Sequence, residues 1–101
     1  MLLYKINKIG GDQMSKVRLI YVCTTANFVA TKEVKIPHIR EGMEISQIFD
    51  SVVANNDEGE IFTITKIRYL LKDKIYIAFI EKKGYCVYDR AYFSETGWKI
   101  K

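Results

Sequence analysis

The stretch 61–81 constrains the fold most strongly, because it reads as two strands around a short polar turn. Its two segments, 61–71 and 75–81, are rich in isoleucine, threonine and aromatic residues, which favour a pleated, half-buried surface. The Lys-Asp-Lys sequence at 72–74 has the polar character of a turn. The stretch therefore predicts an antiparallel hairpin.

The length of this turn decides which residues of the hairpin lie opposite each other. A three-residue loop places Tyr69 opposite Ile77 and Ile67 opposite Phe79, so that apolar side chains meet on one face. A two-residue loop would instead set Arg68 against Ile77. We favour the three-residue register.

A second hairpin is predicted near the N-terminus. Residues 16–25 form a β-branched and aromatic run, and residues 28–36 form another that ends at Pro37, which cannot donate to a strand ladder. Joining the two strands through residues 26–27 gives one nearly apolar face, the condition that fixes register. This register pairs Val17 with Ile36, Leu19 with Val34, and Cys23 with Ala30.

Between the hairpins, the apolar period changes from two residues to about 3.6, which is the helical repeat. The pattern predicts an amphipathic helix over 44–54, preceded by Gly42 and followed by a polar loop at 55–59. That loop lacks the ligand spacing of an EF-hand calcium site, and we interpret it as a solvated connection. The predicted apolar stripe comprises Ile45, Ile48, Phe49, Val52 and Val53.

The C-terminal part is expected to add two strands. Residues 82–84 turn the chain into a strand over 85–93, and residues 95–97 turn it again before a strand over 98–101. The predicted order is ββαβββ, a single small α+β domain over 14–101. Its architecture would be a mostly antiparallel sheet or a partly open barrel with one amphipathic helix.

The first thirteen residues have a second interpretation. Residues 10–14, Gly-Gly-Asp-Gln-Met, can be encoded as GGA GGT GAT CAA ATG, which reads as a bacterial ribosome-binding site followed by a start codon. Residues 1–13 are then a translated leader and Met14 the natural start. The alternative is an additional N-terminal strand, because Tyr4 and Ile6 alternate with polar residues.

Composition indicates a small folded protein of bacterial origin. The chain has 101 residues, a net charge of +4, and more Lys than Arg and more Ile than Leu, the bias of AT-rich codons. We therefore expect a cytoplasmic protein of a low-GC bacterium, its phage or another mobile element. Cys23 and Cys86 lack a Cys-x-x-Cys spacing and are expected to be reduced, largely buried thiols.

The sequence offers little catalytic machinery. His38, the only histidine, follows Pro37 and is expected to be a solvent-facing loop residue, so no His/Cys metal cluster or Ser-His couple is predicted. The available carboxylates have no evident reason to converge. We expect neither enzymatic activity nor a cofactor or metal. The carboxylates considered are Asp50, Glu81, Asp89 and Glu95.

The predicted strand over 85–93 carries the best candidate for a binding surface. Strand alternation puts Tyr88, Arg90 and Tyr92 on one face, where two aromatic rings flank a guanidinium. On the outer side of the preceding hairpin, Lys66, Arg68 and Tyr76 would extend this face. The alternative interpretation is that barrel curvature buries some of these tyrosines and leaves Arg90 paired with a Glu or Asp side chain.

The expected function is that of a non-enzymatic cytosolic binding module that recognises another protein, for example as an inhibitor of a host system. The alternative is a small nucleic-acid-binding β-barrel that uses a basic and aromatic sheet face. A protein partner is favoured because the basic excess is small. No membrane association or small-molecule ligand is expected, and exposed edge strands would allow oligomers.

Overall fold

The computed structural model describes residues 14–48, 51–54, 60–82 and 90–101. These residues form seven strands and one short helix, α2. The elements are β1 (Met14–Cys23), β2 (Phe28–Pro37), β3 (Glu44–Ile48), β4 (Ser51–Ala54), β5 (Glu60–Leu70), β6 (Ile75–Lys82), α2 (Arg90–Glu95) and β7 (Lys99–Ile100).

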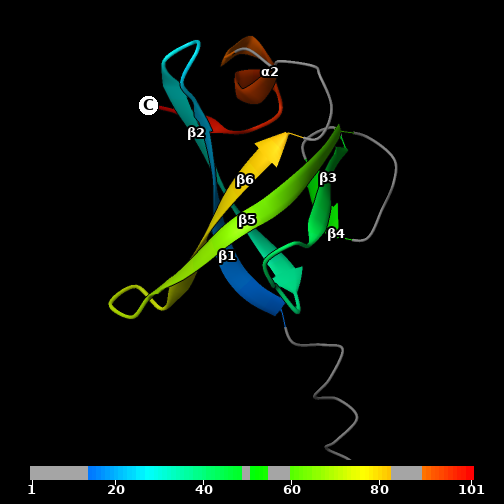
Figure 1. Ribbon diagram of the computed structural model, residues 1–101, viewed down its shortest axis with the longest axis vertical. Helices are drawn as coiled ribbons and strands as arrows, with labels where there is room; N and C mark the ends of the chain where they lie inside the picture. The colour runs from blue at the N-terminus through cyan, green and yellow to red at the C-terminus, as the bar shows by residue number, and fades with distance from the viewer. Residues whose placement is uncertain (1–13, 49–50, 55–59, 83–89) are drawn as a thin grey trace, which may run out of the picture.

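All seven strands belong to one curled sheet with the order β4-β3-β5-β6-β1-β2-β7. Neighbouring strands run antiparallel except β1 and β6, which are parallel. The sheet curls far enough for β4 to approach β2, and α2 lies over one end of the resulting half-barrel (Figure 1). The predicted coarse class, a small β-rich domain with a mostly antiparallel sheet, is confirmed, and the helix of the described residues, α2, follows six strands.

The core lies on the inner face of the half-barrel. Phe93 of α2 is fully buried and stacks on Tyr21 with ring centroids 4.8 Å apart. Trp98, which follows the helix, packs edge-on against Phe93 at 5.1 Å and donates its indole N–H to Gln47 Oε1 at 2.8 Å. The helix and C-terminal segment therefore close one side of the barrel. The strand residues in the core are Val17, Leu19, Cys23, Phe28, Ala30, Ile36, Ile45, Phe62, Ile64, Ala78 and Ile80.

The segment 44–54 forms strands in place of the expected helix. β3 and β4 pair antiparallel around residues 49–50, which lie outside the described residues. Ile45 and Val52 both lie in or against the core, because antiparallel pairing of β3 and β4 brings both to one face of the sheet at a sequence spacing that mimics a helix. The β-branched content of the segment favours strands, and pairing of β3 with β5 supplies the hydrogen bonds.

The β1–β2 hairpin is confirmed, but its predicted register is wrong by two residues. Val17 pairs with Val34, Leu19 with Lys32, and Cys23 with Phe28. The turn is longer than the two residues assumed, because Thr24–Asn27 lie outside the ladder and Asn27 takes the left-handed conformation at φ 58°. A shift of two keeps every side chain on its predicted face, so the apolar face survives the error.

The β5–β6 hairpin is also confirmed, but its register is the alternative one and not the three-residue register that we favoured. Arg68 pairs with Ile77 and Lys66 with Phe79. A β-bulge between Ile64 and Lys66 shifts the register, so that Ile64 pairs with Ile80 and both side chains are buried in the core. Phe79 consequently lies on the outer face, which corrects its predicted place in the core. The bulge therefore allows Ile64 to pair with Ile80 on the inner face while Lys66 and Arg68 lie on the outer face.

The described part of the strand predicted over 85–93 is helical instead. Residues 90–95 form α2, and residues 83–89 lie outside the described residues, as does the leader or strand at 1–13. The predicted C-terminal strand is confirmed as β7, which pairs with β2. In the part of the chain that the structure describes, no helix is long and apolar enough to cross a membrane.

Candidate functional site

The outer face of the sheet carries most of the basic side chains of the long strands. One row across the sheet contains Arg68, Ile77, Arg18 and Glu33, as the strand registers give it. The next row contains Lys66, Phe79, Ile20, Thr31 and Lys99. Cations therefore border this face on both sides, and apolar residues lie between them.

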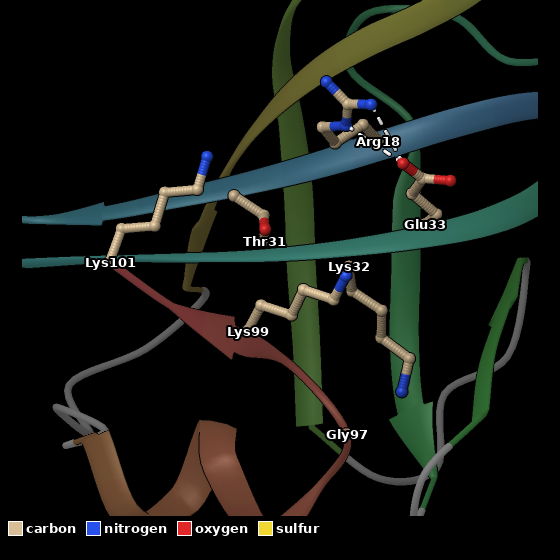
Figure 2. Close-up of a pocket in the computed structure, with 7 residues that line it drawn as sticks. All are labelled: Arg18, Thr31, Lys32, Glu33, Gly97, Lys99 and Lys101. Atoms are coloured by element: carbon tan, nitrogen blue, oxygen red, sulfur yellow. Dashed lines mark hydrogen bonds and ion pairs between the residues drawn. The ribbon is translucent and has the colours of Figure 1, made fainter.

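A groove of about 500 Å³ lies at the β2 and β7 border of this face. Figure 2 shows its lining side chains on β1, β2 and the C-terminal segment. The groove begins where the chain at Gly97 diverges from β2, because the pairing of the C-terminal segment with β2 runs from Val29 to Thr31 and stops there. The lining residues are Arg18, Thr31, Lys32, Glu33, Gly97, Lys99 and Lys101.

Charge in this groove is strongly unbalanced. Glu33 is the one carboxylate side chain that lines it, and Glu33 Oε2 accepts hydrogen bonds from Arg18 Nη2 at 2.9 Å and Arg18 Nε at 3.2 Å. Lys32 Nζ turns toward the helix end and donates to the Thr96 carbonyl at 2.7 Å. Lys99 and Lys101 have no carboxylate partner among the described residues. Their ammonium groups give the groove its net positive charge.

A second, shallower hollow of about 250 Å³ continues the groove along the same two strands. It is lined by Lys16, Glu33, Val34 and Lys35. Lys16 and Lys35 are direct cross-strand partners. Like charges in this position destabilise a sheet, so their placement is not explained by folding. The two hollows share Glu33 and form one basic stripe.

The second notable surface is the tip of the β5–β6 hairpin, which projects from the body of the sheet (Figure 1). Leu71 is 77% exposed, Tyr69 49% and Leu70 38%. Lys72 and Lys74 flank these apolar side chains in the turn, where both are exposed. Tyr69 packs edge-on against its cross-strand partner Tyr76 with ring centroids 4.8 Å apart, which adds a side-chain contact next to the turn.

The structure brings together only some of the residues predicted to bind. Lys66 and Arg68 are exposed on the outer face. Tyr76 is half-buried on the inner face, since it pairs with Val17 and packs against the core. Tyr88 lies outside the described residues. The expected single face is therefore divided between two sides of the sheet and the helix.

Arg90 and Tyr92 lie on α2 and contact the rest of the fold. Arg90 Nη2 donates to the Asn27 carbonyl at 3.1 Å, and the guanidinium lies 5.7 Å from the Phe28 ring centroid. Tyr92 is half-buried against the core, and burial raises its pKa from 10.0 to about 12, with a further contribution from the Glu60 carboxylate. These contacts explain both residues as supports of the helix.

The remaining sequence candidates are dispersed. His38 is exposed in the turn after β2, as predicted. Glu81 lies on β6 and Glu95 on α2, whereas Asp50 and Asp89 fall outside the described residues, as does the loop at 55–59. Within the described ranges, no group of three or more His, Cys, Asp or Glu residues is placed to hold a metal ion.

Cys23 is a free, buried thiol, as predicted, and Cys86 lies outside the described residues. The Cys23 sulfur lies 3.5 Å from the Thr25 hydroxyl. This hydrogen bond, with backbone contributions from Ala26 and Thr25, lowers the pKa of the thiol despite its burial. The interaction links the end of β1 to its turn.

Sequence reasoning missed the basic groove. Its signal was present as two i, i+2 pairs of cations, Lys16 with Arg18 and Lys99 with Lys101, each of which places both side chains on one face of a strand. Their convergence depends on the antiparallel pairing of β7 with β2, which aligns Lys99 with Thr31. Comparisons of the chain with protein-family models, curated proteins and solved structures give no match.

Proposed function

We propose that this chain is a non-enzymatic binding module that engages a protein partner through the tip of its β5–β6 hairpin. The observation that carries the proposal is the exposure of Leu71, which is 77% accessible in the turn between β5 and β6. A leucine there contributes little to folding, and contiguous exposed apolar side chains are typical of interaction sites.

The chemistry of the tip specifies the kind of partner. Tyr69, Leu70 and Leu71 supply an apolar and aromatic centre, and Lys72 and Lys74 supply positive charge at its border. Interfaces combine a desolvated centre with a polar rim whose charges complement the partner. The fitting partner has an apolar cleft bordered by Asp or Glu side chains.

The wider setting of the proposal follows the composition of the chain. We place the module in the cytoplasm of a low-GC bacterium, with a phage or mobile element as its source and inhibition of a host system as its role. Lys and Ile preference supports the source. A projecting hairpin supports the role, because insertion of a short apolar tip into a cleft blocks that cleft without chemistry.

Site-specific crosslinking tests the proposal. A photoreactive phenylalanine analogue replaces Leu71 in one variant and Val22 in a matched control, since Val22 is 51% exposed on another surface of the same sheet. We expect position 71 to crosslink to one discrete host protein in low-GC bacterial cells and position 22 to leave that protein unlabelled. Equal labelling from both positions, or none from position 71, would contradict the proposal.

A further inference from the structure

The basic groove has no role in the hairpin contact and points to a second ligand class. It lies at the β2 and β7 border, whereas the hairpin tip lies at the far end of β5 and β6. We propose that the groove binds the phosphate backbone of single-stranded nucleic acid. This inference goes beyond the protein-binding function and does not depend on it.

The charge of the groove argues for an anionic ligand. Four basic side chains line it, those of Arg18, Lys32, Lys99 and Lys101, against one carboxylate side chain, that of Glu33. The Arg18–Glu33 pair neutralises itself, and Lys99 and Lys101 remain without a carboxylate partner among the described residues. Ammonium groups of this kind bind phosphate oxygens and release the counterions condensed on the polyanion.

The shape of the basic surface argues for an extended ligand. The 500 Å³ groove and the 250 Å³ hollow lie in line along β1 and β2 and share Glu33. From Thr31 to Lys35 the strand spans about 13 Å at the usual rise per residue, which exceeds the size of one phosphate group. Cations occur at both ends of this stripe, as Lys99 and Lys101 at one and Lys16 and Lys35 at the other.

The neighbouring outer face fits the same ligand. Ile20 and Phe79 are half-buried beside Thr31, and Lys66 and Arg68 lie beyond them on β5. A strand whose phosphates follow the groove would direct its bases toward this apolar strip. Backbone contacts of this kind carry no sequence information, so binding is expected to be sequence-tolerant.

Fluorescence anisotropy with a labelled oligodeoxythymidylate tests the inference, using the full chain at about 50 to 200 mM salt. The double variant Lys99→Gln/Lys101→Gln should lower the salt slope by about 1.4, which corresponds to about 25-fold weaker binding at 0.1 M salt. The matched control is Lys72→Gln/Lys74→Gln, which removes the same charge at the hairpin tip. This control should bind as the unchanged chain does.

A gain-of-function variant separates the inference from loss of folding. Glu33→Gln removes the groove carboxylate and releases Arg18, so we expect about fivefold tighter binding at 0.1 M salt and a slope steeper by about 0.7. Asp73→Asn in the hairpin turn is its charge-matched control and should leave affinity unchanged.

Four results would overturn the inference, three of them with the oligonucleotide alone. These are absence of oligonucleotide binding at about 50 mM salt, equal losses in the groove and hairpin double variants, and unchanged affinity in Glu33→Gln. Binding of inorganic tripolyphosphate without binding of the oligonucleotide would also overturn it, because the groove would then accept a small anion. None of these results affects the crosslinking test at Leu71.

Discussion

The two hairpin tips of this sheet have similar turns and opposite surroundings. Each turn leaves four residues outside its ladder, and each ends on a residue in the left-handed conformation, Asn27 at φ 58° and Lys74 at φ 54°. The β1–β2 tip lies beside α2, whereas the β5–β6 tip projects away from the rest of the chain (Figure 1). The turn residues are exposed at both tips, so the difference lies in the contacts that α2 and the C-terminal segment make at the β1–β2 tip.

The β1–β2 tip contacts other parts of the fold. Arg90 donates to the Asn27 carbonyl, Phe28 packs against Phe93, and Lys101 exchanges backbone hydrogen bonds with Val29. The free tip has exposed leucines in the equivalent place. The comparison indicates that one tip contributes to stability and the other is available for recognition.

The largest expected effect comes from truncating Phe93, the centre of the aromatic cluster that packs beside the β1–β2 tip. Phe93→Ala removes a fully buried ring that contacts Tyr21, Phe28, Phe62 and Trp98. We expect a loss of about 3–5 kcal/mol in the free energy of unfolding, enough to unfold so small a domain. Urea denaturation measures this loss, and a change below about 1 kcal/mol would show that α2 does not hold the core.

The next effect is confined to alkaline solution and concerns Tyr92 on the same helix. Its pKa is raised from 10.0 to about 12 in the folded state, so the folded chain keeps this proton where the unfolded chain loses it. The resulting stabilisation is complete below pH 10 and is lost as the pH rises toward 12. The free energy of unfolding, measured across this pH range, should fall less steeply in Tyr92→Phe than in the unchanged chain. Identical pH profiles would contradict a raised pKa of Tyr92 in the folded state.

A smaller loss of unfolding free energy is expected when the contact between α2 and the β1–β2 tip is removed. Arg90→Ala removes the hydrogen bond to Asn27 and the contact with the Phe28 ring. Because Arg90 is exposed, we expect a cost of about 1 kcal/mol in unfolding free energy. Hydrogen exchange should rise at residues 24–27 and stay unchanged at 71–74. Equal changes at both turns would remove the distinction between them.

Glycine substitutions sharpen the comparison of the two turns. A non-glycine residue in the left-handed region costs about 1–2 kcal/mol, and glycine adds about 0.5–1 kcal/mol of entropy cost. Lys74→Gly should therefore raise the unfolding free energy by about 0.5–1 kcal/mol. Asn27→Gly should raise the unfolding free energy by less, since asparagine tolerates this conformation. Thermal unfolding compares the variants, and a larger gain at Asn27 would refute this explanation.

The strands could be predicted where composition and alternation agree. The runs at 16–25, 28–36 and 61–81 carry enough β-branched and aromatic residues to predict β1, β2, β5 and β6. The segment 44–54 could not be assigned by period alone, because two short antiparallel strands reproduce the i, i+3, i+4 spacing of a helix. Tertiary pairing with β5 decides its structure.

Register and surface were harder to predict, for a related reason. The bulge near Thr65 lets Ile64 meet Ile80 while Arg68 meets Ile77, and no local feature of the sequence indicates an inserted residue. Of the predicted binding residues, Lys66 and Arg68 were placed on the correct outer side. The groove depends on β7 reaching β2 from the other end of the chain, a contact that alternation does not specify.

The smallest expected effect is the most direct test of the distinction between the tips. Leu71→Ser changes an apolar side chain that is 77% exposed at the free tip. If Leu71 serves recognition and has no part in folding, the unfolding free energy of the Leu71→Ser variant should stay within about 0.5 kcal/mol of that of the unchanged chain. A loss of about 2 kcal/mol or more would show that Leu71 is packed in solution and contradict a free tip.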